Sequence, residues 1–228
     1  IENACNNLLQ VFESNHISTI YLAYSGGLDS SVLIHSFSQL LSKSSSKEMT
    51  RDAVNDGTAP QVKAIALHVN HGLQNEADSW QLHCEQTCQL LGLEFYTVKL
   101  QLDEEQQKEK GVEATARDAR YKWFFEFMES NNSALLTAHH QGDQAETVLL
   151  NLVRGSGVTG LAGIREQAEH SSKTLLRPFL TVPRETIERY AQQYQLDWIE
   201  DPSNSSAEFL RNRVRHDLLP LMEDIREG

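Results

Sequence analysis

Residues 20–35 contain the feature that most restricts how this chain can fold, because an apolar run there changes abruptly into a glycine turn. Residues 20–24 are aliphatic and aromatic, as expected for a buried strand. The two glycines within 25–27 allow a tight turn and a close approach of the backbone to a ligand. Asp29 and Ser30 then favour a helix start. The stretch predicts a strand, a glycine turn and a helix N-terminus.

This geometry directs unpaired backbone N–H groups and the positive end of a helix dipole at one spot, which favours phosphate binding. A kinase or GTPase loop would need a lysine here and a dinucleotide fingerprint a third glycine, and the sequence has neither. The stretch Ser-Gly-Gly-Leu-Asp-Ser resembles the pyrophosphate loop (PP-loop) of the ATP pyrophosphatases, which cleave ATP between its α and β phosphates. The alternative is an ordinary Gly-Gly turn. We expect ATP to be bound by Ser25, Gly26, Gly27, Leu28, Asp29, Ser30 and His68.

The composition indicates a globular protein with an acidic balance. The 228 residues are enough for one large domain, or for one domain and a piece of another. A formal net charge of -12 disfavours indiscriminate nucleic-acid binding, but a specific enzyme can be acidic overall if its basic groups are clustered. The sequence has neither a signal peptide nor a run of about 18 apolar residues, so we expect a cytoplasmic protein without a membrane span. It begins without Met, so we expect it to be trimmed at this end.

The cysteines do not form a paired framework. There are three, Cys5, Cys84 and Cys88, and an odd number suits free thiols in a reducing compartment. Cys84 and Cys88 lie four residues apart on one face of an expected helix, where they could hold a metal or an iron–sulfur cluster or could simply pack together. We favour packed thiols, because no second cysteine pair completes four ligands.

Strand-like and helix-like segments alternate along the chain. We expect further strands at 62–69, 95–100 and 134–138, with a fifth strand or an extended segment at 175–180. Helices are expected at 1–15, from the glycine turn to 41, and at 76–91, 113–128, 143–153 and 183–194, with a basic helix at 209–223 broken near Pro220. We expect loops at 42–60 (an exposed insertion), 103–110 and 198–204. The alternation predicts an α/β fold: a parallel twisted sheet with helices on both faces and a short C-terminal helical extension.

Polar residues gather at the carboxyl ends of the expected strands, where ligands bind in such sheets. The glycine turn ends the first strand, and His68 lies at the end of the second. His139, His140 and Asp143 follow the fourth. This convergence on one edge of the sheet predicts an active site there.

Carboxylates flank the expected phosphate site. Asp29 and Asp143 each stand at an expected helix start. They could be N-caps, which are common for Asp, or ligands of Mg²⁺, which binds one or two carboxylates together with substrate phosphates. Glu146 falls on the same helix face as Asp143 and could be its outer-sphere partner.

Arginines form three local groups. Arg117 and Arg120 share a helix face with Glu113, and could form a surface ion pair or a guanidinium fork for phosphate or RNA. Arg154 precedes a Gly-Ser-Gly stretch that could stop a helix or let the backbone approach a substrate. The stretch 211–216 has three arginines, which could be a solvated helix end or a site for nucleic-acid phosphates or a transferring phosphoryl group.

Six motifs together resemble the bacterial tRNA(Ile)-lysidine synthetases. They are Ser-Gly-Gly-Leu-Asp-Ser at 25–30, His-Val-Asn-His-Gly-Leu at 68–73, Glu-Ala-Thr-Ala-Arg-Asp-Ala-Arg-Tyr at 113–121, Thr-Ala-His-His with Asp-Gln-Ala-Glu-Thr within 137–147, Arg-Gly-Ser-Gly at 154–157 and Arg-Asn-Arg-Val-Arg-His at 211–216. They span nearly the whole chain in the family's order.

The resemblance implies a reaction and its site residues. ATP adenylates the C2 oxygen of the wobble cytidine of a tRNA(Ile) with a CAU anticodon, and pyrophosphate leaves. The amine of L-lysine then attacks C2 and displaces AMP, giving lysidine. The catalytic residues would be Asp143, Asp29 and Arg211, with Asp143 also accepting or relaying the amine proton and binding Mg²⁺. The substrate and tRNA contacts would be Glu113, Arg117, Arg120, Arg154 and Arg215.

The chain departs from the family at Gly142, where a second aspartate usually precedes Asp143, so one carboxylate is missing from the expected magnesium site. We expect residues 1–204 to form the catalytic domain and 205–228 a basic helical segment that leads to C-terminal domains outside this chain. A homodimer is a possible assembly. One rival function is another PP-loop tRNA-modifying enzyme, such as a thiolase, which would want a cysteine pair. The other is a nucleotide-binding module without chemistry, which would not need Asp143.

Overall fold

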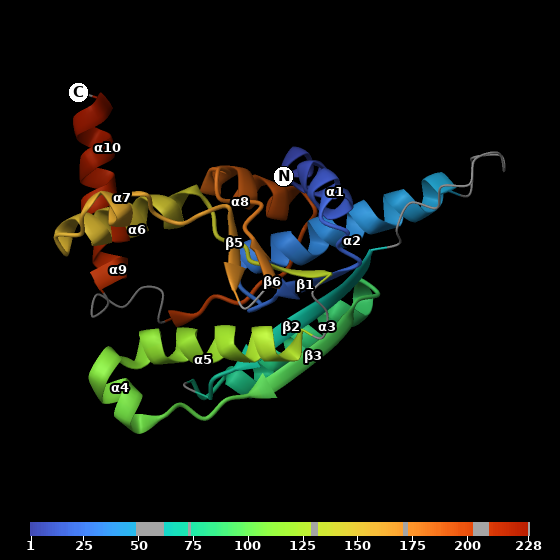
Figure 1. Cartoon of the computed structure of the whole chain (residues 1–228), viewed down its shortest axis with the longest axis horizontal. Coiled ribbons are helices and arrows are strands. Elements are labelled where there is room, and N and C mark those ends of the chain that lie inside the picture. The colour runs from blue at the N-terminus through green and yellow to red at the C-terminus, as the bar shows by residue number, and fades with distance from the viewer. Residues whose placement is uncertain (49–61, 73, 129–131, 171–172, 203–209, 228) are drawn as a thin grey trace.

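The computed structural model describes residues 1–48, 62–72, 74–128, 132–170, 173–202 and 210–227. Six strands form one sheet in the order β3-β2-β1-β4-β6-β5 (Figure 1). The strands are β1 (Thr19–Ala23), β2 (Lys63–Asn70), β3 (Glu94–Lys99), β4 (Ser133–Leu136), β5 (Gln167–His170) and β6 (Lys173–Leu176). The helices are α1 (Glu2–Ser14), α2 (Leu28–Glu48), α3 (Ala77–Leu90), α4 (Glu104–Lys110), α5 (Val112–Phe127), α6 (Gln141–Val153), α7 (Val158–Leu161), α8 (Arg184–Gln193), α9 (Leu210–Arg213), the π-helical turn η2 (Val214–Leu218) and α10 (Leu219–Glu227).

The predicted α/β fold is confirmed, with one difference at the edge of the sheet. Strands β1, β2, β3, β4 and β6 pair in parallel, whereas β5 runs antiparallel to β6. Strand β5 was not predicted, because its four residues are mostly exposed and contain no apolar run.

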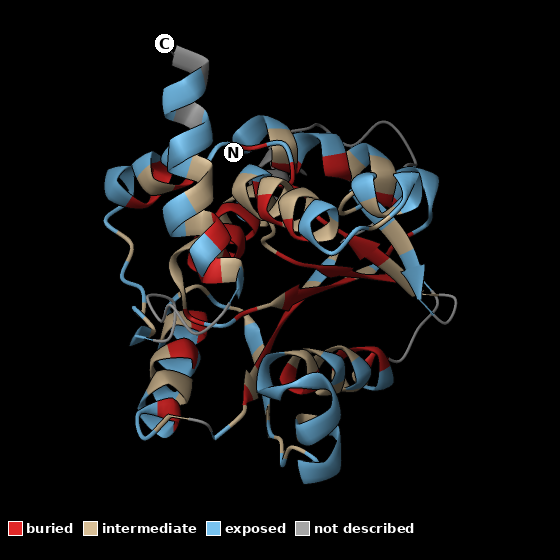
Figure 2. Cartoon of the chain, turned by 90° about the vertical axis from the view of Figure 1, so that its left-hand side faces the viewer, coloured by how far each residue is buried: buried red, intermediate tan, exposed pale blue. Residues whose placement is uncertain are grey.

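Side chains of β1 alternate between two hydrophobic cores, as the two-residue period of a strand requires. Ile20 and Leu22 pack with residues of α1, α2, α3 and α8, whereas Tyr21 packs with Phe124 and Phe125 of α5. Figure 1 shows α1 and α8 on one side of the sheet and α5 on the other, and Figure 2 shows the buried strands between these layers. The sheet is therefore held fixed from both faces, with its carboxyl edge left for the site.

Helices α2 and α4 differ from the prediction. Helix α2 continues to Glu48, so the expected insertion cannot begin at residue 42, and its remainder at 49–61 lies outside the described residues. The charged run 103–110 is not a loop, because Asp103 accepts the N–H groups of Glu105 and Gln106 and so caps α4.

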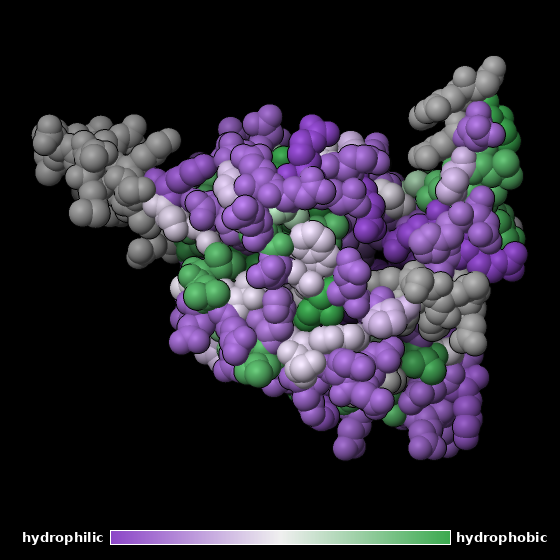
Figure 3. All heavy atoms as spheres, turned by 180° about the vertical axis from the view of Figure 1, so that it is seen from behind, coloured by the Kyte–Doolittle hydropathy of each residue, from purple (hydrophilic) through white to green (hydrophobic). Residues whose placement is uncertain are grey.

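The C-terminal segment is helical throughout residues 210–227 and is not broken at Pro220. The turn η2 precedes Pro220 and has π geometry, in which the N–H of Leu219 reaches the carbonyl of Val214. Pro220 follows directly as the second residue of α10, so the changed hydrogen-bond pattern of η2 accommodates its missing N–H within a continuous helix. Helix α10 projects from the domain and exposes apolar side chains, including Leu221 and Ile225 (Figures 1 and 3). Across the described residues, the helices are either too short or too polar to span a bilayer.

Candidate active site

The glycine turn between β1 and α2 is closely packed from beneath. Gly26 has a φ of +87°, a conformation that favours glycine. A Cβ at Gly26 would lie 2.5 Å from Cδ1 of Ile199 and 2.9 Å from Sγ of Cys84. The N–H of Ile199 also donates to the carbonyl of Gly26 at 2.9 Å. The strand-turn-helix prediction is confirmed, and the 198–202 loop, which the sequence analysis left without a function, supports the turn.

Serine hydroxyls fix the shape of the same turn. The Oγ atoms of Ser25 and Ser30 lie 3.0 Å apart, and Oγ of Ser30 donates to the carbonyl of Gly27 at 2.9 Å. The first N–H groups of an α-helix have no acceptor within the helix, and at α2 they follow this turn. The turn is thus a preformed cradle of peptide N–H groups at the positive end of α2, suited to phosphate.

His68 supports the cradle indirectly. It lies within β2, two residues before the strand ends at Asn70, and not at the strand end as expected. Its buried Nδ1 lies 2.9 Å from the carbonyl oxygen of Tyr24, directly before the cradle, and burial lowers the pKa of His68. His68 is not among the residues that line the cleft described next, so its part in ATP binding stays a prediction.

A cleft of about 1190 Å³ opens at the carboxyl edge of the sheet, in front of the cradle. Its lining brings together the cradle, the start of α6, one side of α8 and the η2–α10 junction. Among the described residues, six carboxylates and three arginines line it: Asp29, Asp143, Glu146, Glu188, Glu200, Asp201, Arg120, Arg184 and Arg215. The predicted convergence at this edge is therefore present for the glycine turn, His139, His140 and Asp143, but not for His68.

Asp143 and Glu146 are paired with arginines of the C-terminal segment. The Nη2 atom of Arg211 donates to Oδ1 of Asp143 at 2.8 Å, and its Nε donates to Oε2 of Glu146 at 2.6 Å. The Nε atom of Arg215 donates to Oε1 of the buried Glu146. Helix α6 and the segment α9–η2, far apart in sequence, are thus joined by a network of ion pairs beside the cleft.

The start of α6 is capped by His140 and not by Asp143. Nδ1 of His140 accepts the N–H of Gly142 at 3.0 Å, while Oδ2 of Asp143 accepts the N–H of His140 at 2.9 Å. A Cβ at Gly142 would lie 2.7 Å from Cε1 of His140, so this ring fills the space beside the glycine. Burial opposes ionisation of Asp143, but His140 and Arg211 outweigh it and hold the pKa of Asp143 below its usual value.

Asp29 faces the same histidine from the cradle. Nε2 of His140 lies 3.9 Å from Oδ2 of Asp29 and 3.7 Å from Oδ2 of Asp143, so the two carboxylates flank one ring. Oδ1 of Asp29 is buried and has no hydrogen-bond partner among the described residues. Burial raises the pKa of Asp29. The structure therefore brings together the acidic residues predicted at two distant positions.

Of the two predicted arginines of α5, one lines the cleft and the other does not. Arg120 lines the cleft, and burial lowers its pKa. Arg117 lies 5.3 Å above the ring of Tyr121 and does not line the cleft, while Glu113 is exposed. Burial lowers the pKa of His139, which also lines the cleft, to about 3, so this imidazole is neutral at pH 7.

Arg154 does not join the site. It is the exposed C-cap of α6, at the end of the helix opposite Asp143, and it is absent from the cleft lining. In contrast, Arg184 and Ile199 line the cleft although neither was predicted as a site residue, and His140, predicted only as part of the convergence at this edge, lies at its centre between Asp29 and Asp143. The N-terminal position of His140 and the proline before Arg184 were visible in the sequence, but the approach of Ile199 depends on tertiary structure alone.

Cys84 and Cys88 are buried free thiols, as the packing alternative predicted. Burial raises the pKa of each to about 12. Within the described part of the chain, no group of three or more histidines, cysteines or carboxylates could hold a metal by itself.

The fold and the site define a nucleotide-binding α/β domain with a phosphate cradle and an acidic, arginine-lined cleft. The chain belongs to the PP-loop family, because the model of the PP-loop domain matches residues 2–222. Among curated relatives, the chain is 43% identical over 201 residues to the tRNA(Ile)-lysidine synthase of Alkalilimnicola ehrlichii, covering 88% of this chain and 41% of that protein. It is 40% identical over 204 residues to that of Legionella pneumophila (strain Lens), covering 89% and 42%.

Solved structures share the fold at low sequence identity. The U34-tRNA thiolase NcsA from Methanococcus maripaludis has a TM-score of 0.68 and 16% identity, covering 98% of this chain and 75% of that one. The NH3-dependent NAD synthetase from Campylobacter jejuni has a TM-score of 0.55 and 15% identity, covering 99% and 82%. The chain spans about two-fifths of the length of the curated relatives it matches, for example 42% of the Legionella protein.

Proposed function

We propose that this chain is the ATP-using catalytic part of a tRNA(Ile)-lysidine synthase, with residues 1–204 as the catalytic domain and 205–228 as a basic segment that completes it. Its substrates would be ATP, L-lysine and a tRNA(Ile) with a CAU anticodon, encountered in the cytoplasm, and a homodimer is one assembly to test. The observation that carries the proposal is the position of Asp143. Its carboxylate, held by Arg211, flanks His140 opposite Asp29 of the cradle.

The first step would place the terminal phosphates of ATP on the N–H groups of the cradle. The C2 oxygen of cytidine then attacks the α-phosphorus, and pyrophosphate departs with the electrons of the broken P–O bond. Negative charge grows on the phosphates during this step, so fixed N–H dipoles and guanidinium groups lower the barrier. Arg120 is suited to this role, because it lines the cleft without an ion-pair partner among the described residues.

The second step needs the lysine side chain at the activated C2. The lowered pKa of Asp143 keeps its carboxylate ionised at neutral pH, so it can hold the amine and accept or relay its proton. The bond from the amine nitrogen to C2 forms as AMP leaves with the C2 oxygen.

The site also fits Mg²⁺, which prefers carboxylates together with substrate phosphates. The buried Oδ1 of Asp29 has no partner in the described part of the chain, whereas both oxygens of Asp143 accept hydrogen bonds. Asp29 would therefore be a direct ligand, and Asp143, predicted as the ligand from the sequence, would join it through the carboxylate lone pairs that these two hydrogen bonds leave unused. When bound, Mg²⁺ would offset the phosphate charge in this acidic cleft.

The thiolase alternative has less support. The buried thiols of Cys84 and Cys88, each with a pKa of about 12, are poorly suited to carry sulfur or bind a cluster. A nucleotide-binding module without chemistry would not need the Asp143 carboxylate beside the cradle.

Asp143→Asn in the full-length protein tests the proposal. We expect lysine incorporation into CAU-anticodon tRNA to fall by about 100-fold or more, because proton transfer and amine positioning depend on this carboxylate. ATP binding should remain within a few-fold. Asp217→Asn, an exposed carboxylate on the adjacent turn η2, is the matched control and should keep the wild-type rate. Incorporation at the wild-type rate in Asp143→Asn would contradict the proposed role.

A further inference from the structure

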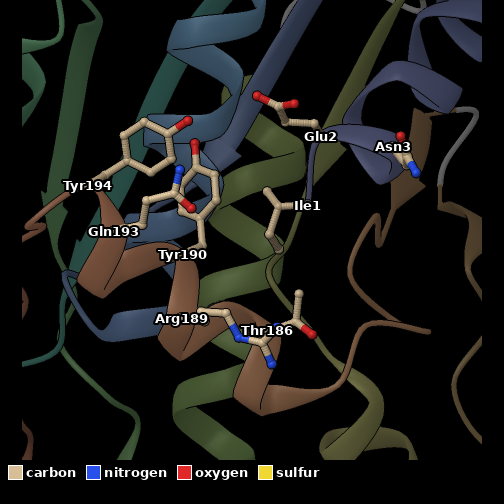
Figure 4. A pocket seen from close by; sticks show the side chains of 8 residues that line it. All are labelled: Ile1, Glu2, Asn3, Thr186, Arg189, Tyr190, Gln193 and Tyr194. Atoms are coloured by element: carbon tan, nitrogen blue, oxygen red, sulfur yellow. The ribbon is translucent and has the colours of Figure 1, made fainter.

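One side of helix α8 lines the cleft. Arg184, Glu188 and Gln192 are spaced four residues apart, so they form one stripe along the helix, and all three line the cleft. The other side of α8 carries Arg189 and Tyr190, which line a separate shallow pocket of about 370 Å³ (Figure 4). Helix α8 therefore presents one arginine to the cleft and another away from it.

Arg184 uses only part of its hydrogen-bonding capacity. Its Nε donates to Oε1 of Glu188 at 2.9 Å, and both side chains are about half exposed, at 44% and 45%. Among the described residues, its two Nη atoms have no hydrogen-bond partner. A guanidinium has five N–H donors in a planar fork that suits phosphate oxygens. Arg184 therefore keeps four donors available at the cleft.

The charge of Arg184 acts on the cradle. Burial opposes its charged form, but Glu188, Asp29 and Asp143 outweigh it and raise the pKa of Arg184. Asp29 belongs to the cradle, so the guanidinium lies within electrostatic range of the place where the terminal phosphates would bind. Arg215, also in the cleft, is already paired with the buried Glu146. Of these two, Arg184 is the one whose exposed partner can release it without leaving a buried charge.

We propose that Arg184 binds the pyrophosphate end of ATP, exchanging its contact with Glu188 for phosphate oxygens when the nucleotide enters the cradle. Without nucleotide, the carboxylate of Glu188 pairs with the guanidinium of Arg184. When ATP is bound, phosphate oxygens take the place of that carboxylate. During adenylation the positive charge then stabilises the departing pyrophosphate. This inference rests on the proposed use of ATP, but not on the identity of the nucleophile or of the tRNA.

Titration calorimetry with inorganic pyrophosphate and, separately, AMP, both in the presence of Mg²⁺, tests the proposal on the full-length protein. We expect Arg184→Gln to weaken pyrophosphate binding about tenfold, the size of a lost charge-assisted contact. AMP binding should not change. Glu188→Gln should tighten pyrophosphate binding a few-fold, because it removes the competing carboxylate. Arg189→Gln, on the opposite side of α8, is the matched control and should match the wild type.

The proposal is overturned if Arg184→Gln binds pyrophosphate like the wild type, if it loses AMP and pyrophosphate affinity equally, or if the wild type binds no pyrophosphate. Because Arg184 and Glu188 form an exposed pair, circular dichroism should show folded variants in every case. Lysine incorporation into tRNA tests the proposed function separately. If the wild type incorporates no lysine but Arg184→Gln still weakens pyrophosphate binding, the proposed function is refuted and the role of Arg184 remains supported.

Discussion

Gly26 shows how one residue can determine the shape of the phosphate cradle. Two separate requirements exclude a side chain there: a φ of +87°, and the lack of space between Ile199 and Cys84. The sequence indicated the first requirement through the Gly-Gly pair, but not the second, because its partners lie 58 or more positions away along the chain. The cradle is thus a property of the packed domain as well as of its local motif.

We expect Gly26→Ala to destabilise the protein more than Gly92→Ala. Gly92 also has a positive φ, +67°, but a Cβ there would meet nothing within 4 Å, so it isolates the backbone effect. Strain alone should lower the unfolding free energy by about 1–2 kcal/mol in Gly92→Ala. Crowding against Ile199 and Cys84 should add about 1–3 kcal/mol in Gly26→Ala. Urea unfolding measures both, and equal losses would show that the packing beneath the cradle is loose.

At the scale of elements, the docking of the C-terminal segment on α6 forms one wall of the cleft. The segment packs against α6, and its arginines bind Glu146, whose side chain is only 1% exposed. Removing one partner of a buried ion pair strongly destabilises a protein, because the charge that remains is left without compensation. The ion pairs therefore fix where α9 and η2 lie.

Glu146→Gln should loosen this segment before it unfolds the rest of the domain. The substitution keeps the size of the side chain but removes its charge, at a cost of about 3 kcal/mol. Hydrogen exchange should accelerate in α9 and η2 and stay unchanged in β1 and β4. The control is Arg213→Ala, because Arg213 pairs with Asp217 on the surface, where both side chains are more than 60% exposed (64% and 69%). If exchange is unaffected in Glu146→Gln, apolar packing and not the ion pairs anchors the segment.

Elements rich in apolar residues were predictable from the sequence, and those stabilised by capping or by strand pairing were not. Strand β1 was predicted from its continuous apolar run and helix α5 from its many apolar residues, and both were confirmed. Helix α4 is stabilised by the Asp103 cap and by lysines in its last turn, which a count of apolar residues ignores. Strand β5 exists only because β6 offers it a partner.

At the scale of the whole molecule, the candidate site combines segments from both ends of the chain, and its parts were predictable to different degrees. Motifs placed Asp29 and Asp143 at one edge of the sheet, because the carboxyl ends of parallel strands coincide. Arg154 lies outside the site because of helix length, since the 13 residues of α6 place it about 20 Å from the helix start. No local pattern reveals that His140 fills the space beside Gly142.

The net charge of -12 leads to a prediction for the whole chain: this chain should bind ATP but hold tRNA weakly. Tight tRNA binding depends on many phosphate contacts from clustered Lys and Arg, and each contact steepens the loss of affinity with salt. Here Arg211 and Arg215, two of the three arginines in the cluster at 211–216, are engaged by carboxylates, so they are less available to the RNA backbone.

We expect a dissociation constant for CAU-anticodon tRNA no tighter than about 1 μM near physiological salt, the range of non-specific binding. Fluorescence anisotropy of labelled tRNA, repeated over a salt series, measures both the affinity and the number of phosphate contacts. Titration with ATP on the same preparation controls for an intact site. Nanomolar binding with a steep salt dependence would contradict the prediction. It would mean that this acidic domain binds tRNA tightly through a basic surface of its own, in addition to binding ATP.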